Sequence, residues 1–133
     1  MSMYVTDTHP LIYYFGPNRR QLSARARNLF EQAEQSEAFI LIPAPVIWEV
    51  SMLEQVGHIK LDRPFAEWLK ALLQNPCFDC TPLDAAIIAE ARSYGFNNDI
   101  FDAVIVATAK LRDLPLITRD VAITNSGLVE VYW

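Results

Sequence analysis

The chain has 133 residues, close to the size at which one domain forms around one hydrophobic core. Hydrophobic residues make up 52% and charged residues 20%, a composition that excludes an intrinsically disordered protein. The net charge of -5 excludes a protein that holds nucleic acid through a broad basic face, because Lys and Arg neutralise the phosphates in such complexes. Any contact with nucleic acid must therefore be local or bridged by metal.

The sequence predicts a soluble, cytoplasmic protein without membrane contact. Its first residues lack the basic start and apolar core of a signal peptide, and no apolar run approaches the ~20 residues that span a bilayer. Two cysteines, Cys77 and Cys80, are too few for a disulfide framework, which agrees with a reducing compartment. Their Cys-x-x-Cys spacing lacks the helix start of a redox pair and the four ligands of structural zinc, so half-buried strand cysteines are expected.

Apolar periodicity predicts strands alternating with helices along the chain. The predicted strands, in chain order, lie at residues 3–6, 39–42, 77–81, 115–118 and 128–133. The predicted helices lie between them, at residues 11–15, 22–36, 43–56, 64–73, 83–94 and 100–111, with a short helix after residue 120. A break at residues 16–18 separates the first two helices. Gly57 and Gly95 mark two helix ends. This alternation predicts an α/β fold of one domain, residues 1–133, in which helices cover both faces of a parallel sheet.

Five acidic residues fall at or near predicted helix starts, namely Asp7, Glu49, Asp99, Asp102 and Asp120. Each one alone is accounted for by helix capping and by the positive end of the helix dipole. Together they indicate more, because the helix starts that follow parallel strands lie along one edge of the sheet, where such folds bind ligands. Glu49 and Asp102 also stand among apolar neighbours, and a buried carboxylate without a partner is costly.

A cluster of carboxylates with no His or Cys ligands beside it suits the hard cations Mg²⁺ and Mn²⁺. Such a site can activate water and neutralise a phosphodiester in the transition state. The spacing from Asp99 to Asp102 leaves two roles open for Asp99, a metal ligand and a helix cap. The acidic residues therefore predict a hydrolytic metal site.

Four segments carry a family resemblance: residues 4–9 (YVTDTH), 46–50 (VIWEV), 99–109 (DIFDAVIVATA) and 116–120 (LITRD). In these segments, and in their order, the chain resembles the PIN-domain ribonucleases and especially the toxins called VapC. Each fragment is weak alone, whereas four in the right order make a fairly specific signal.

The resemblance implies a three-layer α/β/α sandwich around a parallel sheet of about five strands, with one or two Mg²⁺ or Mn²⁺ ions. It implies that Asp7, Glu49, Asp102 and Asp120 are the catalytic acids and metal ligands, with Asp99 as a further acid and Thr118 as a supporting hydroxyl. By the same resemblance, the protein is an endoribonuclease that hydrolyses single-stranded or looped RNA, pairs with a small antitoxin and forms a homodimer.

One departure concerns Ala103, which stands where relatives carry a basic residue after the second acid. A substrate contact at that position is therefore not expected, while the metal ligands are unaffected.

Basic and aromatic residues offer further candidates. The densest basic cluster is Arg19, Arg20, Arg25 and Arg27. Arg19 and Arg20, together with Arg119, are the candidates for RNA phosphates, although a solvated helix face or an antitoxin contact explains the cluster equally well. The three tryptophans, Trp48, Trp68 and Trp133, fall in apolar patterns that favour core or dimer contacts over base stacking. A capping or partly buried role is favoured for His9 over a role in the site.

Three other classes of protein fit less well. A phosphotransferase of the haloacid-dehalogenase type needs a second Asp where this chain has His9, and a response receiver needs paired early acids. The glycines are too widely spaced for a nucleotide-binding loop. The remaining alternative is a catalytically silent PIN-like module that binds a protein, in which the carboxylates are only caps; the complete acidic set argues against it.

Overall fold

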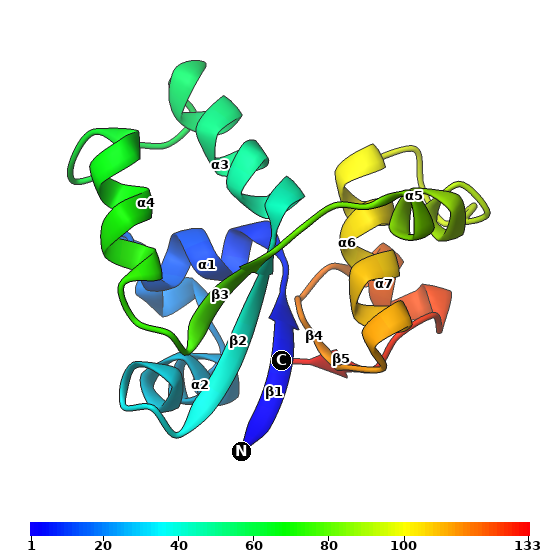
Figure 1. The fold of residues 1–133 in the computed structure, drawn as a ribbon, viewed down its shortest axis with the longest axis horizontal. Helices are drawn as coiled ribbons and strands as arrows, with labels where there is room; N and C mark the ends of the chain where they lie inside the picture. Colours follow the sequence, from blue (N-terminus) through cyan, green and yellow to red (C-terminus); the bar gives the residue numbers. More distant parts are fainter.

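Five parallel strands form one sheet in the order β3-β2-β1-β4-β5 (Figure 1). The computed structural model describes residues 1–133. The strands are β1 (Ser2–Thr6), β2 (Ala38–Pro43), β3 (Phe78–Thr81), β4 (Leu116–Ile117) and β5 (Val131–Tyr132). All four neighbouring pairs run parallel, as the alternation of strands and helices predicts.

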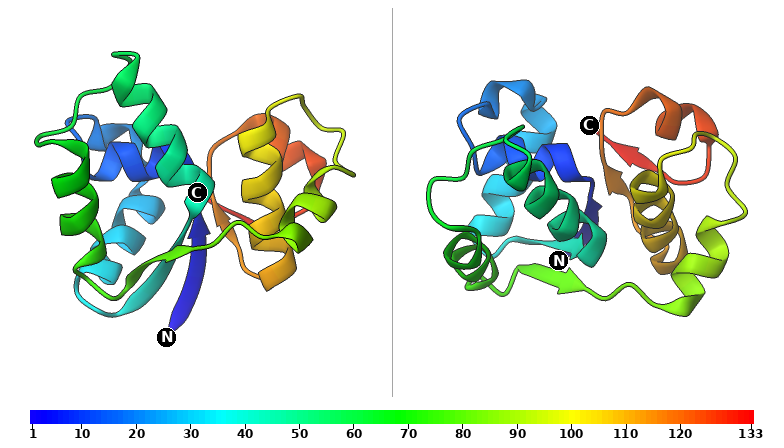
Figure 2. Two further views of the ribbon diagram at one scale, coloured as in Figure 1. Left: turned by 45° about the horizontal axis from the view of Figure 1, so that its top comes forward. Right: turned by 90° about the horizontal axis from the view of Figure 1, so that it is seen from above.

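Seven α-helices connect and cover the strands. They are α1 (Thr8–Tyr14), α2 (Ala24–Glu34), α3 (Ala44–Gln55), α4 (Phe65–Leu73), α5 (Ala85–Ala91), α6 (Ile100–Arg112) and α7 (Val121–Ser126), with a 3₁₀ turn, η1 (Arg19–Gln21). Viewed from above, α1, α2 and α4 lie to one side of the sheet and α5 to α7 to the other, while α3 touches both α1 and α6 (Figure 2). The predicted three-layer α/β/α fold is therefore confirmed.

The order of the strands reverses at β1. From β1 the chain adds β2 and β3 on one side, and then returns to place β4 and β5 on the other. In open parallel sheets, the crevice at such a reversal, outside the carboxyl ends of the strands, is where ligands bind. Here the reversal lies between β1 and β4, whose carboxyl ends are held together by the bond from the Asp7 amide to the Ile117 carbonyl (3.0 Å).

The core holds these strands rigidly. Val5, Ile40, Ile42, Leu116 and Ile117 are fully buried in the sheet and pack against helices on both faces. Burying one such side chain contributes about 1.5–3 kcal/mol. The carboxyl ends of the strands therefore hold the residues that follow them in defined positions.

Helix α5 is shorter than predicted. The apolar pattern indicated residues 83–94 with a stop at Gly95, whereas the helix spans Ala85–Ala91. It begins late because the side chain of Asp84 caps it by accepting from the Ile87 amide (3.0 Å). It ends early because the last turn tightens, with the Ser93 amide bonding to the Glu90 carbonyl three residues back (3.2 Å).

The last two strands are also shorter than predicted, with two residues each instead of four and six. Pro115 has no amide hydrogen to contribute to the sheet, so β4 begins at Leu116, whose amide bonds to the Glu130 carbonyl (2.8 Å). The other predicted strands and helices are present, and Gly57 has the left-handed backbone (φ +80°) expected just beyond α3.

None of the helices combines the length and apolar character that crossing a bilayer requires. Both cysteines are free thiols. Cys80 is half-buried within β3, as predicted, whereas the prediction was wrong for Cys77, which is buried and lies just before the strand.

Candidate active site

Asp7 lies just beyond the carboxyl end of β1, beside the end of β4. It follows β1 directly and caps α1, because its Oδ1 accepts a hydrogen bond from the Thr8 amide (2.8 Å). Its Oδ2 accepts from the hydroxyl of Thr118 (2.7 Å), and the residue is only 8% exposed. Asp7 is thus a buried carboxylate oriented by two donors.

Thr118 and Asp120 approach from the end of β4. The Thr118 hydroxyl, while donating to Asp7, also accepts from the Asp120 amide (3.1 Å). Asp120 in turn caps α7, because its Oδ1 accepts from the Ile123 amide (2.9 Å). One buried hydroxyl therefore fixes the position of Asp120 relative to Asp7.

Glu49 reaches the same region from the second turn of α3. Its Oε1 accepts from the hydroxyl of Thr8 (2.5 Å), the residue next to Asp7. Glu49 is half-buried and makes no bond to a backbone amide. Its position is therefore set by α1 and not by any capping of its own helix.

Asp99 and Asp102 come from the start of α6. Asp99 is the N-cap, and its Oδ1 accepts from the amides of Phe101 (2.8 Å) and Asp102 (3.2 Å). Asp102 is half-buried, and its Oδ2 accepts from the side-chain amide of Asn97 (2.9 Å). Of the two roles open for Asp99, the structure shows the cap.

The pKa values of these carboxylates respond to one another. Burial raises the pKa of Asp102 to about 7, and the negative charges of Asp7, Asp99 and Asp120 contribute to the increase. Burial likewise raises the pKa of Asp7, against the hydrogen bonds from Thr118 and Thr8. Mutual repulsion of this kind places the acids in one electrostatic cluster.

Glu49 belongs to the same cluster. Burial raises its pKa, the bond from Thr8 lowers it, and the charges of Asp7 and Asp99 raise it further. The side chain of His9 is exposed on α1, and its charge lowers the pKa of both Glu49 and Asp7.

The carboxylates have the donor chemistry for a divalent cation but are not closed around one point. No group of three or more His, Cys, Asp or Glu side chains is arranged to hold a metal ion as it stands. Each of four acids keeps one carboxylate oxygen without a hydrogen bond: Glu49, Asp99, Asp102 and Asp120. Free oxygens on these like-charged groups, of which Glu49, Asp102 and Asp120 are half-buried and Asp99 is exposed, suit Mg²⁺ or Mn²⁺, which would offset their repulsion.

The three arginines predicted to contact phosphates differ in whether their guanidinium groups already have partners within the protein. Arg19 donates to the Tyr14 carbonyl (2.9 Å) and lies over the Tyr14 ring, 4.0 Å from its centre. Arg119 donates to the hydroxyl of Tyr13 (2.9 Å). Arg20 is exposed and makes no side-chain hydrogen bond or ion pair, so it alone of the three is free.

The other two arginines of the cluster also have internal partners. Arg25 lies over the ring of Tyr132 (4.4 Å), and Arg27 pairs with Glu31 (3.9 Å) on the same helix. These contacts spread the cluster over several neighbours and do not form one open basic patch.

The tryptophans divide between core and surface. Trp68 is 6% exposed and belongs to the core, whereas Trp48 is 61% exposed. Trp48 packs edge-on against Phe101 of α6, with ring centres 5.8 Å apart. The apolar pattern of α3 hid this exposure, because α3 carries apolar residues on its outer face as well.

Sequence reasoning missed two residues of the site. Thr8 and Asn97 are not among the candidates that the sequence indicates, yet they donate to Glu49 and Asp102. The signal available for Thr8 was a hydroxyl directly after a candidate acid. Nothing in the local sequence distinguishes Asn97 from an ordinary cap.

The fold and the site together define an α/β protein with an acidic cluster at the strand-order reversal of a parallel sheet. The PIN domain family model matches residues 4–125, and the chain belongs to the PIN domain family. The family resemblance seen in the four sequence segments is thereby confirmed.

Several solved structures share the fold over nearly their whole length. VapBC2 from Rickettsia felis bound to a promoter DNA fragment is similar at 16% identity and a TM-score of 0.66, covering 98% of this chain and 97% of that one. A FitAcB structure from Neisseria gonorrhoeae matches at 22% identity and a TM-score of 0.63, covering 98% of this chain and 97% of that one. A toxin-antitoxin complex from Klebsiella pneumoniae matches at 19% identity and 0.63, covering 98% and 96%. Among curated proteins, none matches significantly.

Proposed function

We propose that residues 1–133 form one nuclease domain, a Mg²⁺- or Mn²⁺-dependent endoribonuclease that hydrolyses RNA phosphodiester bonds. The observation that carries the proposal is the position of Glu49 and Asp102. Neither carboxylate caps a helix, and both are half-buried next to the buried Asp7. Burying a carboxylate that does not stabilise the fold costs free energy. A functional site explains why such buried carboxylates are present.

The proposed roles follow from the contacts. Asp7, Glu49, Asp102 and Asp120 would hold the metal, with Asp99 as a further ligand. The bound ion would activate water and neutralise charge on the phosphodiester. The chain's own donors orient its acids: Thr118 holds Asp7, Thr8 holds Glu49 and Asn97 holds Asp102.

The proposed substrate is single-stranded or looped RNA. With a net charge of -5, the protein cannot rely on phosphate neutralisation over a wide surface. Arg20 is the phosphate contact that the geometry favours, because its guanidinium is uncommitted, whereas Arg19 and Arg119 first have to leave their tyrosine partners.

We further propose that the protein is the toxin of a toxin–antitoxin pair. The similar structure from Klebsiella pneumoniae is described as a toxin-antitoxin complex. A small antitoxin would silence the enzyme by placing Arg or Lys among the acids, since a cation there satisfies the carboxylates and displaces metal.

A homodimer is supported by exposed apolar side chains on one face of α3. Trp48 and Met52 of α3, and Val56 just beyond its end, are exposed and recur every four residues. Contiguous exposed apolar surface is typical of protein interfaces.

The alternative, a catalytically silent protein-binding module, draws support from three acids that do cap helices: Asp7, Asp99 and Asp120. It leaves Glu49 without a role and explains Asp102 only by its place in the first turn of α6, near the positive end of the helix dipole.

Cleavage of a fluorescent single-stranded RNA by purified protein tests the proposal. We expect cleavage with Mn²⁺ or Mg²⁺, none with chelator, and none by Asp102→Asn. Asp84→Asn is the matched control, because Asp84 caps α5 outside the acidic cluster. No metal-dependent cleavage by the folded parent would favour the silent module, and equal cleavage by Asp102→Asn and the parent would contradict the assignment of Asp102 to the site.

A further inference from the structure

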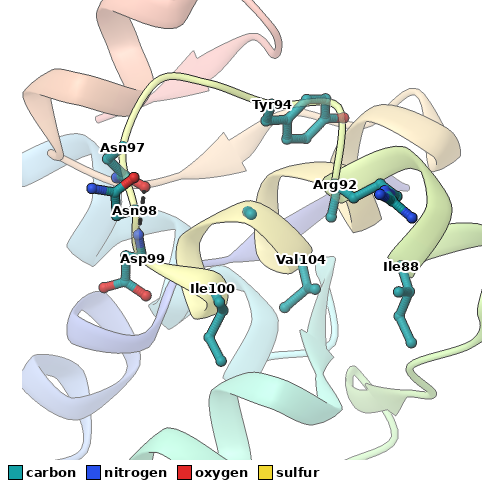
Figure 3. A pocket seen from close by; sticks show the side chains of 10 residues that line it. Ile88, Arg92, Tyr94, Asn97, Asn98, Asp99, Ile100 and Val104 are labelled. Atoms are coloured by element: carbon teal, nitrogen blue, oxygen red, sulfur yellow. Dashed lines mark hydrogen bonds between the residues drawn. The ribbon is translucent and has the colours of Figure 1, made fainter.

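A cavity of about 320 Å³ opens beside the acidic cluster, between α5 and the first turns of α6 (Figure 3). Its lining includes Ile88, Arg92, Tyr94, Asn98, Ile100 and Val104. Aliphatic side chains and one aromatic ring thus share the cavity with an amide and a guanidinium. This mixture is typical of sites for small, largely apolar ligands with a polar edge.

The cavity and the acidic cluster share a wall. Asn97 lines the cavity, and its side-chain NH₂ donates to Asp102 (2.9 Å), while its side-chain Oδ1 accepts from the Asp99 amide (3.0 Å), the contact dashed in Figure 3. Asp99 also lines the cavity. A chemical group bound in the cavity therefore lies close to the phosphodiester that is proposed to react at the acidic cluster.

Two polar side chains of the cavity have unused hydrogen-bonding capacity. Asn98 is exposed and its side chain makes no hydrogen bond, and the guanidinium of Arg92 has neither a hydrogen bond nor an ion pair. Ile100, at 73% exposed, leaves an apolar surface beside them. A purely apolar occupant would cover these polar groups without satisfying them, at a cost of about 1–3 kcal/mol each.

We propose that this cavity binds an unpaired nucleobase next to the scissile phosphodiester, an inference that rests on the proposed nuclease function. Single-stranded bases are recognised by stacking on apolar or aromatic side chains and by hydrogen bonds to their edges. Here Tyr94 and the aliphatic walls supply the stacking surface, Asn98 the edge contact and Arg92 a cation for the flanking phosphate. Binding by the base also suits an acidic protein, because it needs little phosphate neutralisation.

The test compares two substrates in the presence of Mn²⁺, an RNA oligonucleotide and bis(4-nitrophenyl) phosphate, a diester without a base. Val104→Phe fills the cavity, and we expect the ratio of the two kcat/KM values, RNA over diester, to fall roughly tenfold. Asn98→Ala should change which base is preferred at one position beside the cut. The matched controls are Leu111→Phe, exposed on the same helix, and Asn125→Ala, exposed on α7; both should keep the parent's ratio and preference.

The outcomes separate the two proposals. A parent that hydrolyses neither substrate contradicts the nuclease function. An active parent whose ratio and base preference are unchanged in both variants overturns the base-binding cavity alone. In a third outcome, Val104→Phe shifts the mass in solution from dimer to monomer, and the ratio of the two kcat/KM values falls only when the dimer is lost. The cavity then belongs to a protein interface, and the inference is wrong.

Discussion

The hydroxyl of Thr118 donates a 2.7 Å hydrogen bond to Asp7, joining two buried residues that lie 111 positions apart. Because the same hydroxyl accepts from the Asp120 amide, it connects the ends of β1 and β4 through a single atom. Three consequences can be measured: the orientation of Asp7, its pKa and the stability of the fold.

Thr118→Val should reduce cleavage at least about tenfold and lower the free energy of unfolding by about 1–3 kcal/mol, because buried Asp7 loses a donor. The pKa of Asp7 should rise further, since the bond from Thr118 lowers it. Thr118→Ser keeps the hydroxyl and should retain most activity. Steady-state kinetics and urea denaturation of both variants check this, and equal losses in Val and Ser variants would contradict it.

Without metal, the parent should be less stable at pH 7.5 than at pH 5. The pKa of Asp102 is about 7 in the fold and 3.8 for an ordinary Asp, so the folded protein binds more protons between these values. The free energy of unfolding therefore falls as pH rises from about 4 to about 7, and then levels. Urea denaturation in chelator across this range measures the trend.

Asp102→Asn should weaken that pH dependence and be the more stable protein at pH 7.5 without metal, with a melting temperature higher by about 2–5 °C. The amide oxygen can still accept from Asn97, so the fold is kept. Asp7→Asn is a poorer probe, because Asp7 accepts from two donors and an amide must turn its NH₂ toward one of them. A parallel pH dependence in parent and Asp102→Asn would show that Asp102 is not its source.

Saturating Mn²⁺ should raise the melting temperature of the parent, because an ion that binds only the folded state stabilises it, by about 2.7 kcal/mol at a hundred times Kd. Asp102→Asn should gain much less. Asp84→Asn, whose carboxylate caps α5, should gain as much as the parent. Equal gains in all three proteins would mean that the acids do not form one metal site.

Thr8→Val should selectively weaken the contribution of Glu49, which loses its hydroxyl donor while Asp7 keeps the backbone amide of residue 8. We expect a several-fold higher Mn²⁺ concentration for half-maximal cleavage, within the range of about 10–100-fold seen when supporting residues of metal sites are removed. Thr8→Ser should behave as the parent. A Mn²⁺ titration of activity decides between these results.

Replacing both cysteines should leave cleavage intact, since no proposed step uses sulfur. Cys77→Ala combined with Cys80→Ser is suitable, because Cys77 is buried and a serine there would bury a hydroxyl. The double variant should lose some thermal stability. Inactivity in a variant with the parent's circular dichroism spectrum would revive a role for the thiols.

The sequence by itself determined the elements and the approximate places of the acids. Periodicity and capping are local properties, so Asp7, Asp99 and Asp120 could be placed at helix starts from neighbouring residues alone. The alternation of elements determined a parallel sheet, and a parallel sheet brings such helix starts to one edge.

Only the tertiary structure decided which side chains meet at that edge. Strand order placed β4 beside β1, and that pairing, between segments more than a hundred residues apart, produced the contact between Thr118 and Asp7. The bond from Thr8 to Glu49 and the exposure of Trp48 likewise depend on how α1, α3 and α6 pack. Local patterns carry no information about such contacts, because they are fixed by the joint burial of distant apolar surfaces and not by the preferences of neighbouring residues.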